Sequence, residues 1–266
     1  MSYKHRPVFV LFGDSLTEWS FDEDTRGFGL FLREMYEGRV EVVNEGQAGY
    51  TSTRLKPNFT RIITRTTSPT APPTLLFTIF LGANDACIIG DTAYIPWPEF
   101  ESNMRMFIET ILTQDAMPNT KIVLIGPPPI NAASADSDIG AKQTAREVEE
   151  VNEWRKGGQR YKTYVSKKRY AEGMMGIAGE YGETGRVVGL DFWREMVDAL
   201  YEEEGGVYDE ELPPGSGLLG AKCFGEGWFT DGLHLDVKGY AVLSKALFEL
   251  VTKTWPELAP ERLEVV

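Results

Sequence analysis

Five short runs along the chain are almost continuously apolar, and each ends in residues that favour turns. They cover residues 7–13, 40–46, 75–85, 121–129 and 185–192. A strand with one solvated face alternates apolar and polar residues, whereas a continuously apolar run is typical of a strand buried on both faces, as in a parallel sheet. The pattern therefore predicts about five parallel strands.

Four further segments have a helical pattern, in which apolar residues recur every three or four positions. They are residues 27–39, 96–114, 160–182 and 236–255. Strands that alternate with helices favour a doubly wound α/β sheet with right-handed crossovers. The chain shows no internal repeat and no low-complexity linker, so we expect a single domain over residues 1–266.

Two stretches interrupt the alternation of strands and helices. Residues 131–160 are polar and charged, and residues 201–229 are rich in glycine, proline and acids. Loops of this length are uncommon inside a compact domain and tend to be functional or mobile. We interpret both as insertions, either tolerated at the surface or functional.

Composition narrows the possible partners. Acidic residues outnumber basic ones 40 to 27, giving a net charge of -13, which repels nucleic acid and anionic membranes. Cys87 and Cys223 lack metal-site spacing and suggest a reducing compartment. The N-terminus does not resemble a signal peptide, and no apolar run approaches the roughly 20 residues of a membrane span. We therefore expect a cytoplasmic protein without a membrane span.

A serine and a histidine are the main candidates for chemistry. Ligands of open parallel sheets bind beyond the carboxyl ends of the strands, and Ser15 directly follows the first run. A serine hydroxyl needs a base, for which histidine is best suited. His5 precedes the first strand in an exposed terminus, which leaves His234. Asp231, three residues earlier, can orient the imidazole.

Acyl transfer also needs hydrogen-bond donors for the developing oxyanion. The amide of Asn84, after the third run, and the N–H groups of Gly49 and Ser15 are candidates. Each signal is weak alone, since Asn84 and Asp85 can form an ordinary turn and a glycine can simply provide a positive φ. Together they supply a nucleophile, a base, an orienting acid and oxyanion donors.

The stretches "GDSLT", "NEGQAG", "GAND" and "DGLH", in that order, resemble the GDSL-type lipases and acylhydrolases, also called SGNH hydrolases. The longer stretches "FGDSLTEWSF", "FLGANDAC" and "DGLHLDVKGY" are similar to the branch of isoamyl acetate-hydrolysing esterases. The family's four signature residues fall on Ser15, Gly49, Asn84 and His234, and Asp231 completes the triad. Gly49 matches better than Gly46 because the family's glycine lies five positions after an asparagine, here Asn44.

This resemblance implies a three-layer α/β/α sandwich of the flavodoxin-like type, with about five parallel strands. It also implies a serine esterase that forms an acyl-enzyme on Ser15 and takes a small-molecule ester, with no metal and no organic cofactor. We expect short acyl groups, chiefly acetate as in isoamyl acetate. The oligomeric state is left open.

Other functions remain as alternatives. Within the same family they are a carbohydrate O-acetyl esterase and a lysophospholipase or thioesterase. A different class is a non-catalytic, flavodoxin-like binding protein. A phosphate-binding loop is disfavoured, because Asp14 and Glu18 flank the hydroxyl-bearing loop and repel phosphate.

Three further expectations concern residues other than the four signature residues and Asp231. Glu18 and Trp19 stand where many family members have a small residue, so they are expected to narrow the acyl side of the pocket. The stretch 201–229 ends two residues before Asp231, so we hypothesise that it forms a wall or a lid of the site. A basic cluster on the helical segment 160–182 is expected to be a solvated helix face. Its members are Lys162, Lys167, Lys168 and Arg169.

Overall fold

A computed structural model describes residues 6–88, 93–132 and 144–265 of the chain. The strands form one sheet in the order β2-β1-β3-β4-β5, and every neighbouring pair is parallel, which confirms the predicted sheet. The strands are β1 (Val8–Gly13), β2 (Glu41–Gly46), β3 (Thr74–Phe80), β4 (Lys121–Ile125) and β5 (Val187–Leu190).

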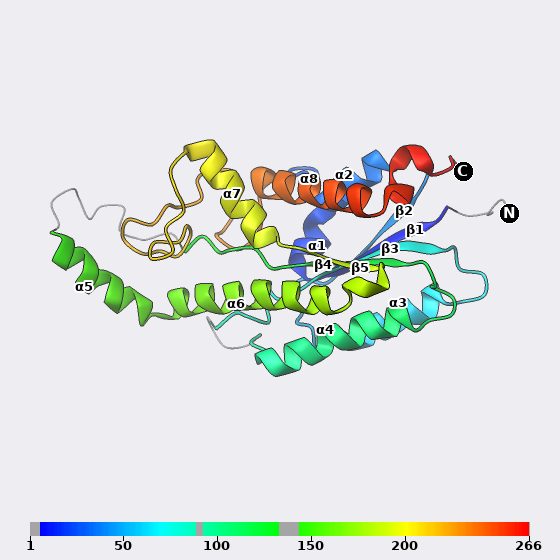
Figure 1. Cartoon of the computed structure of the whole chain (residues 1–266), viewed down its shortest axis with the longest axis horizontal. Helices are drawn as coiled ribbons and strands as arrows, with labels where there is room; N and C mark the ends of the chain where they lie inside the picture. The colour runs from blue at the N-terminus through cyan, green and yellow to red at the C-terminus, as the bar shows by residue number, and fades with distance from the viewer. Residues whose placement is uncertain (1–5, 89–92, 133–143, 266) are drawn as a thin grey trace.

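Helices cover both faces of the sheet, which gives the expected three layers. Figure 1 shows α2, α7 and α8 on one face and α3, α4 and α6 on the other. The helices are α1 (Ser15–Glu18), α2 (Phe28–Met35), α3 (Lys56–Thr66), α4 (Trp97–Leu112), α5 (Ala145–Lys156), α6 (Gln159–Glu180), α7 (Phe192–Glu204) and α8 (Val237–Thr254). Short 3-10 helices lie at Trp19–Phe21, Gly182–Thr184, Pro256–Leu258 and Pro260–Arg262. Across the described ranges, we find no helix with the length and apolar character that crossing a bilayer requires.

The continuous apolar runs follow from this layering. In β1, Phe9 and Leu11 point into the core that includes α2, α7 and α8, whereas Val10 and Phe12 point into the core that includes α3, α4 and α6. Successive side chains of a strand point to opposite faces, so a strand covered on both sides needs apolar residues at every position.

The structure contains helices that the sequence analysis did not assign. The polar stretch 131–160 was expected to be an irregular insertion, but it contains α5 and the first residues of α6. Thr144 and Glu147 form a capping box at the start of α5, which stabilises a helix whose exposed face carries few apolar residues. Residues 133–143 of this stretch lie outside the described residues. The stretch 201–229 likewise begins inside α7.

The rest of that second stretch, residues 205–229, packs against the first. The amide of Asn152 in α5 donates to the Leu219 carbonyl (3.1 Å) and accepts from the Leu219 N–H (2.7 Å). Arg155 donates to the Gly217 carbonyl at 2.7 Å. Phe224 and Trp228 are buried and contact each other edge to face. Residues 205–229 are therefore an anchored segment that forms no helix and closely contacts α5.

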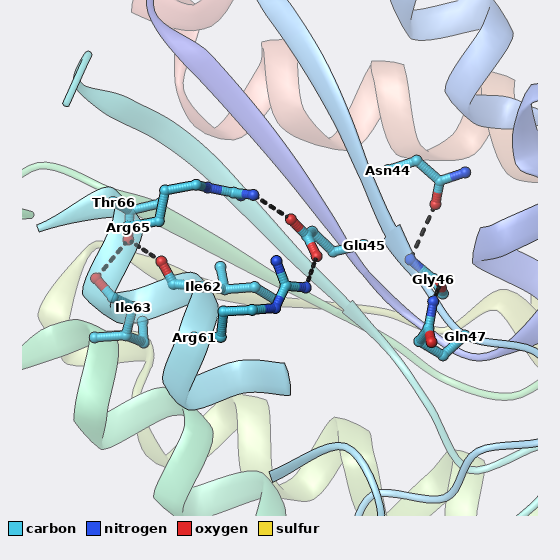
Figure 2. Close-up of polar contacts among 9 residues, drawn as sticks. All are labelled: Asn44, Glu45, Gly46, Gln47, Arg61, Ile62, Ile63, Arg65 and Thr66. Atoms are coloured by element: carbon cyan, nitrogen blue, oxygen red, sulfur yellow. Dashed lines mark hydrogen bonds and ion pairs between the residues drawn. The ribbon is translucent and has the colours of Figure 1, made fainter. Parts of the chain in front are cut away.

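A buried acid on the edge strand β2 holds α3 in place. Figure 2 shows the Glu45 carboxylate between Arg61 and Arg65, with N–O distances of 2.8 and 2.6 Å. At the end of the same strand, the Gly46 N–H donates to the side chain of Asn44 at 2.9 Å. These contacts fix the point at which the chain leaves β2 and enters the loop that carries Gly49.

Candidate active site

Ser15 lies where β1 turns into α1. The carboxylate of Asp14 accepts a hydrogen bond from the Leu16 N–H (3.0 Å) and caps the short helix, so Ser15 is its first residue. A Cβ atom at Gly13 would lie 2.2 Å from Thr17 Oγ1 and 2.4 Å from the Phe80 carbonyl oxygen, so only glycine fits there. This tight turn places the Ser15 side chain at the carboxyl edge of the sheet, where it is 5% exposed.

His234 reaches Ser15 from the loop that precedes α8. The distance from Ser15 Oγ to His234 Nε2 is 3.0 Å, and His234 Nδ1 lies 2.7 Å from Asp231 Oδ2. The other oxygen of Asp231 accepts from the N–H groups of Leu233 (2.9 Å) and His234 (2.8 Å). The structure thus brings the three predicted residues into one hydrogen-bonded chain.

The electrostatics of Asp231 suit an orienting carboxylate. Partial burial disfavours its charged form, but hydrogen bonds from His234 and Leu233 outweigh this effect and lower the pKa of Asp231 below its ordinary value. The group is therefore ionised at neutral pH and can stabilise a positive charge on the neighbouring imidazole. A serine with such a partner can act as a nucleophile.

The predicted oxyanion donors lie on loops that hydrogen bonds hold together. The Asn84 amide donates to the Tyr50 carbonyl (2.8 Å), directly after Gly49, and the Gln47 N–H donates to the Gly13 carbonyl (3.0 Å). Gly49 has a φ of +75°, which favours glycine. The N–H groups of Ser15 and Gly49 have no acceptor among the described residues, so both can donate to a ligand.

Glu18 supports the loop that carries Gly49, a contact that the sequence analysis did not predict. Its carboxylate accepts a hydrogen bond from the Ala48 N–H, and its main-chain carbonyl accepts from the Asn44 amide at 2.8 Å. A Cβ atom at Gly46 would lie 2.1 Å from the Glu18 N atom, so α1 and the end of β2 are in direct backbone contact. Glu18 therefore fixes the loop that presents Gly49 relative to Ser15.

Three buried charged residues lie behind these loops. Asp85 accepts from the Ser52 N–H (2.9 Å) and hydroxyl (2.6 Å), which joins the loop after β3 to the loop after β2. Burial raises the pKa of Asp14 to about 7 and that of Asp85 to about 6. Lys167 was expected on a solvated helix face, but it is 1% exposed and donates to the Ala83 carbonyl at 2.6 Å.

Sequence reasoning assigned no part in the site to three buried residues of this region, which are Asp14, Asp85 and Lys167. Trp19 was expected to narrow the acyl side of the pocket, and its ring packs against that of His234. Asp14 and Asp85 could have been found from their places inside the two motifs. Lys167 gives no signal in the sequence, because it stands among solvated bases. The other candidate base, His5, lies outside the described residues.

A cavity of about 330 Å³ opens beside the hydrogen-bonded chain. It lies at the carboxyl edge of the sheet, over the ends of β3 and β4, and Cys87, Ile130, Ala132, Lys167, Asp231 and Leu233 are among its lining residues. Larger hollows lie near Val8 and Thr74, at the amino ends of β1 and β3. The smaller cavity is lined by Asp231, whereas these two larger hollows are not, so its position and not its volume identifies it.

A five-stranded α/β/α sandwich that carries a hydrogen-bonded serine, histidine and aspartate at the carboxyl edge of its sheet has the architecture of a hydrolytic enzyme. The chain belongs to the GDSL-like lipase/acylhydrolase family, whose model matches residues 9–247. This match confirms the resemblance found in the motifs. The protein is a carboxylic ester hydrolase.

Similar proteins support this membership. A GDSL esterase/lipase of Arabidopsis thaliana is 30% identical over 97% of this chain and 90% of its own length. The isoamyl acetate-hydrolyzing esterase of Saccharomyces cerevisiae is 25% identical over 96% of this chain and 90% of its own. The crystal structure of Axe2, an acetylxylan esterase from Geobacillus stearothermophilus, has the same fold, with a TM-score of 0.57 and 16% identity over 95% of this chain and 96% of that one.

Proposed function

We propose that this protein is a serine esterase that hydrolyses short-chain carboxylic esters, acetate esters above all, through an acyl-enzyme on Ser15. The observation that carries the proposal is the unbroken chain from Ser15 Oγ through His234 to Asp231, with distances of 3.0 and 2.7 Å. We further propose that residues 1–266 form one hydrolase domain and that it acts in the cytoplasm.

Acylation uses the hydrogen-bonded chain directly. With the imidazole proton on Nδ1 facing Asp231, the Nε2 atom of His234 accepts the Ser15 hydroxyl proton as Oγ attacks the ester carbonyl carbon. The C–O bond to the alcohol then breaks, and His234 returns the proton to the leaving alkoxide. Asp231 remains ionised and stabilises the imidazolium between these two transfers.

The negative charge on the carbonyl oxygen needs donors while the tetrahedral intermediate exists. The N–H groups of Ser15 and Gly49, which have no acceptor among the described residues, can supply two of them, and the Asn84 amide can supply the third. A single donor of this kind contributes roughly 10²–10³ in rate. The donors come from the loops after β1, β2 and β3, which the contacts of Glu18 and Asp85 hold together.

Deacylation repeats the same steps with water as the nucleophile. His234 takes a proton from the water as its oxygen attacks the acyl carbon, and then gives the proton to Ser15 Oγ as the acyl–serine bond breaks. The products are a carboxylic acid and a restored serine. Every proton and electron pair in the cycle is accounted for by these residues, the ester and water.

The cavity that adjoins Asp231 is small, which supports a small substrate. Its volume of about 330 Å³ lies at the lower end of the roughly 300–1,000 Å³ that ligand pockets occupy. The yeast relative's name, an isoamyl acetate-hydrolyzing esterase, points to the same class of substrate. Both observations favour acetate and its near homologues over long-chain lipids.

Active-site labelling followed by a substrate scan tests this proposal. A fluorophosphonate probe should label the wild-type protein and the control variant Ser102→Ala, which changes an exposed serine on α4, but it should not label Ser15→Ala. Turnover of p-nitrophenyl esters should fall as the acyl chain grows beyond acetate. Sugar acetates, thioesters and lysophospholipids are assayed beside isoamyl acetate. Labelling that persists in Ser15→Ala would refute the assignment of the nucleophile.

A further inference from the structure

Lys167 is a buried lysine in the middle of α6. Its exposure is 1%, although Lys162 on the same helix is exposed. An ammonium group is costly to remove from water unless other groups compensate its charge. The burial of Lys167 therefore needs an explanation, and the mechanism proposed above does not provide one.

The hydrogen bond of Lys167 leads to the loop after β3. Its Nζ atom donates to the carbonyl oxygen of Ala83 at 2.6 Å. That oxygen belongs to the peptide group joining Ala83 to Asn84, so the contact fixes the peptide plane from which Asn84 extends. The Asn84 carbonyl in turn accepts from the Cys87 N–H at 2.9 Å, which closes a tight turn around the amide-bearing residue.

The charge of Lys167 acts on two further groups of the site. Asp14 precedes Ser15 and Asp85 follows Asn84, and both carboxylates interact electrostatically with the ammonium. Each of these carboxylates has one buried oxygen without a hydrogen-bond partner among the described residues. The ammonium is therefore a nearby positive charge for these buried carboxylates, which belong to the turns that carry the nucleophile and the oxyanion amide.

We propose that Lys167 is a positioning residue, whose ammonium group fixes the Asn84 amide relative to Ser15 by way of the Ala83 carbonyl and the carboxylates of Asp14 and Asp85. This inference rests on the proposed function, since it concerns the oxyanion site of the same reaction. Lys167 does not touch the reacting atoms. It acts by holding one donor in the geometry that the transition state requires.

The expected effect follows from the geometry of oxyanion stabilisation. A displacement of about 1 Å in a group that positions the reaction can cost about 10²-fold in rate. Such a loss appears in kcat, because the oxyanion forms only in the transition state, whereas substrate binding is little changed. A lysine with a purely structural role would lower stability without this selective effect on kcat.

The test compares three variants on p-nitrophenyl acetate. Lys167→Met removes the charge at similar length, Lys167→Arg retains it, and Lys162→Met is the matched control on the exposed face of α6. We expect Lys167→Met to lower kcat by about 10–100-fold with KM changed by less than about threefold. Lys167→Arg should recover most of kcat, and Lys162→Met should match the wild type. Thermal unfolding of each variant reports on its fold.

A pH profile supplies a readout that stability does not influence. Burial lowers the pKa of Lys167 to about 8, against the opposing effects of Cys87, Asp14 and Asp85. The ammonium is therefore lost as the pH rises through that value, and the wild-type kcat should fall with it. Arginine stays protonated, so Lys167→Arg should lack this alkaline decline. The comparison of the wild type with Lys167→Arg tests the positioning role of the ammonium even if Lys167→Met does not fold.

Several results would overturn the inference. An unchanged kcat in folded Lys167→Met, or the same alkaline decline in Lys167→Arg as in the wild type, would show that the ammonium does not position the site. A change confined to KM would make Lys167 a substrate-binding residue of the cavity instead. If the wild-type protein hydrolyses no ester, the proposed function itself fails, which is a distinct outcome.

Discussion

The indole ring of Trp19 lies against the imidazole ring of His234, with ring centroids 4.3 Å apart and an angle of 51° between the planes. Trp19 is 43% exposed, so it covers one side of the proposed base while its outer edge faces solvent. The face of an aromatic ring attracts a cation. Trp19 is thus placed to favour the imidazolium that forms during proton transfer.

Replacing Trp19 should slow the reaction without abolishing it. A cation–π contact contributes about 0.5–2 kcal/mol, which corresponds to a loss of about 2–30-fold in kcat for Trp19→Ala. Trp19→Phe should retain most of the activity, because it keeps an aromatic face. Steady-state kinetics with p-nitrophenyl acetate measures both. Trp154→Ala, at a 79% exposed tryptophan on α5, is the control, and equal kcat values in all variants would refute the contact's role.

The proposed triad predicts an order of losses. His234→Ala should lower kcat by at least about 10⁴-fold, because within residues 6–88, 93–132 and 144–265 no other base is hydrogen-bonded to Ser15. Asp231→Asn should lose less, since it removes only the orientation and charge behind the imidazole. Single-turnover acylation, with circular dichroism to check the fold, measures this order. A more severe loss in the aspartate variant would contradict the assignment of roles.

The buried carboxylate of Asp14 predicts a pH-dependent stability. Burial raises its pKa from 3.8 to about 7, so folding disfavours the charged form. Its contribution to the free energy of unfolding is present at low pH and is lost as the pH rises towards about 7. The asparagine of Asp14→Asn does not titrate, so the stability of this variant does not decrease for this reason as the pH rises. The variant should therefore gain stability relative to the wild type between about pH 5 and pH 7, by up to about 1.4 kcal/mol per pH unit.

Urea unfolding at several pH values measures this difference. Asp115→Asn, at an exposed acid in the turn after α4, serves as the control and should show a constant difference from the wild type. A difference between Asp14→Asn and the wild type that does not change with pH would show that the Asp14 carboxylate is not shifted. A difference that falls with rising pH would give the opposite sign and contradict the argument.

The hydrogen bonds of Asn152 lead to a prediction about residues 205–229 and the substrate selectivity of the pocket. Asn152→Ala removes both of its hydrogen bonds to Leu219 and leaves the part-buried N–H and C=O groups of Leu219 unpaired, which should cost about 1–3 kcal/mol in the free energy of unfolding. If residues 205–229 form a wall of the site, as we hypothesise, the variant should also change selectivity along an ester chain-length series. Glu149→Ala, exposed on the same helix, is the control. Unchanged selectivity would refute the wall.

The sequence was sufficient to predict the sheet because its strands are covered on both faces, which requires runs without polar residues. The sequence was also sufficient to predict that Ser15, Asp231 and His234 lie close together. Ser15 follows the first strand, Asp231 and His234 precede the last helix, and ligands of such a sheet bind at its carboxyl edge. The structure supports that placement through hydrogen bonds. The catalytic roles themselves stay predictions until the variants are measured.

Other features depend on contacts between distant segments, which no local pattern records. Lys167 and its neighbour Lys168 look alike in the sequence, and only the packing of α6 shows that the first is buried. Glu18 looks like a pocket residue beside the serine, yet its carboxylate turns to the Ala48 N–H. The helix α5 was missed because its apolar residues are few, although its capping box is visible as Thr144 and Glu147.

Because α5 packs on residues 205–229, the sequences of these two segments cannot change independently of each other. Leu219 and Gly217 accept hydrogen bonds from side chains of a helix more than sixty positions earlier, so the packing of each segment depends on the other. In a chimera that took only α5 or only residues 205–229 from a relative, the hydrogen-bonding groups between the two segments would lose their partners. We expect such a chimera to misfold in this region. The two segments therefore have to be exchanged together, and if residues 205–229 form a wall of the site, as we hypothesise, the exchange should change which esters this hydrolase accepts.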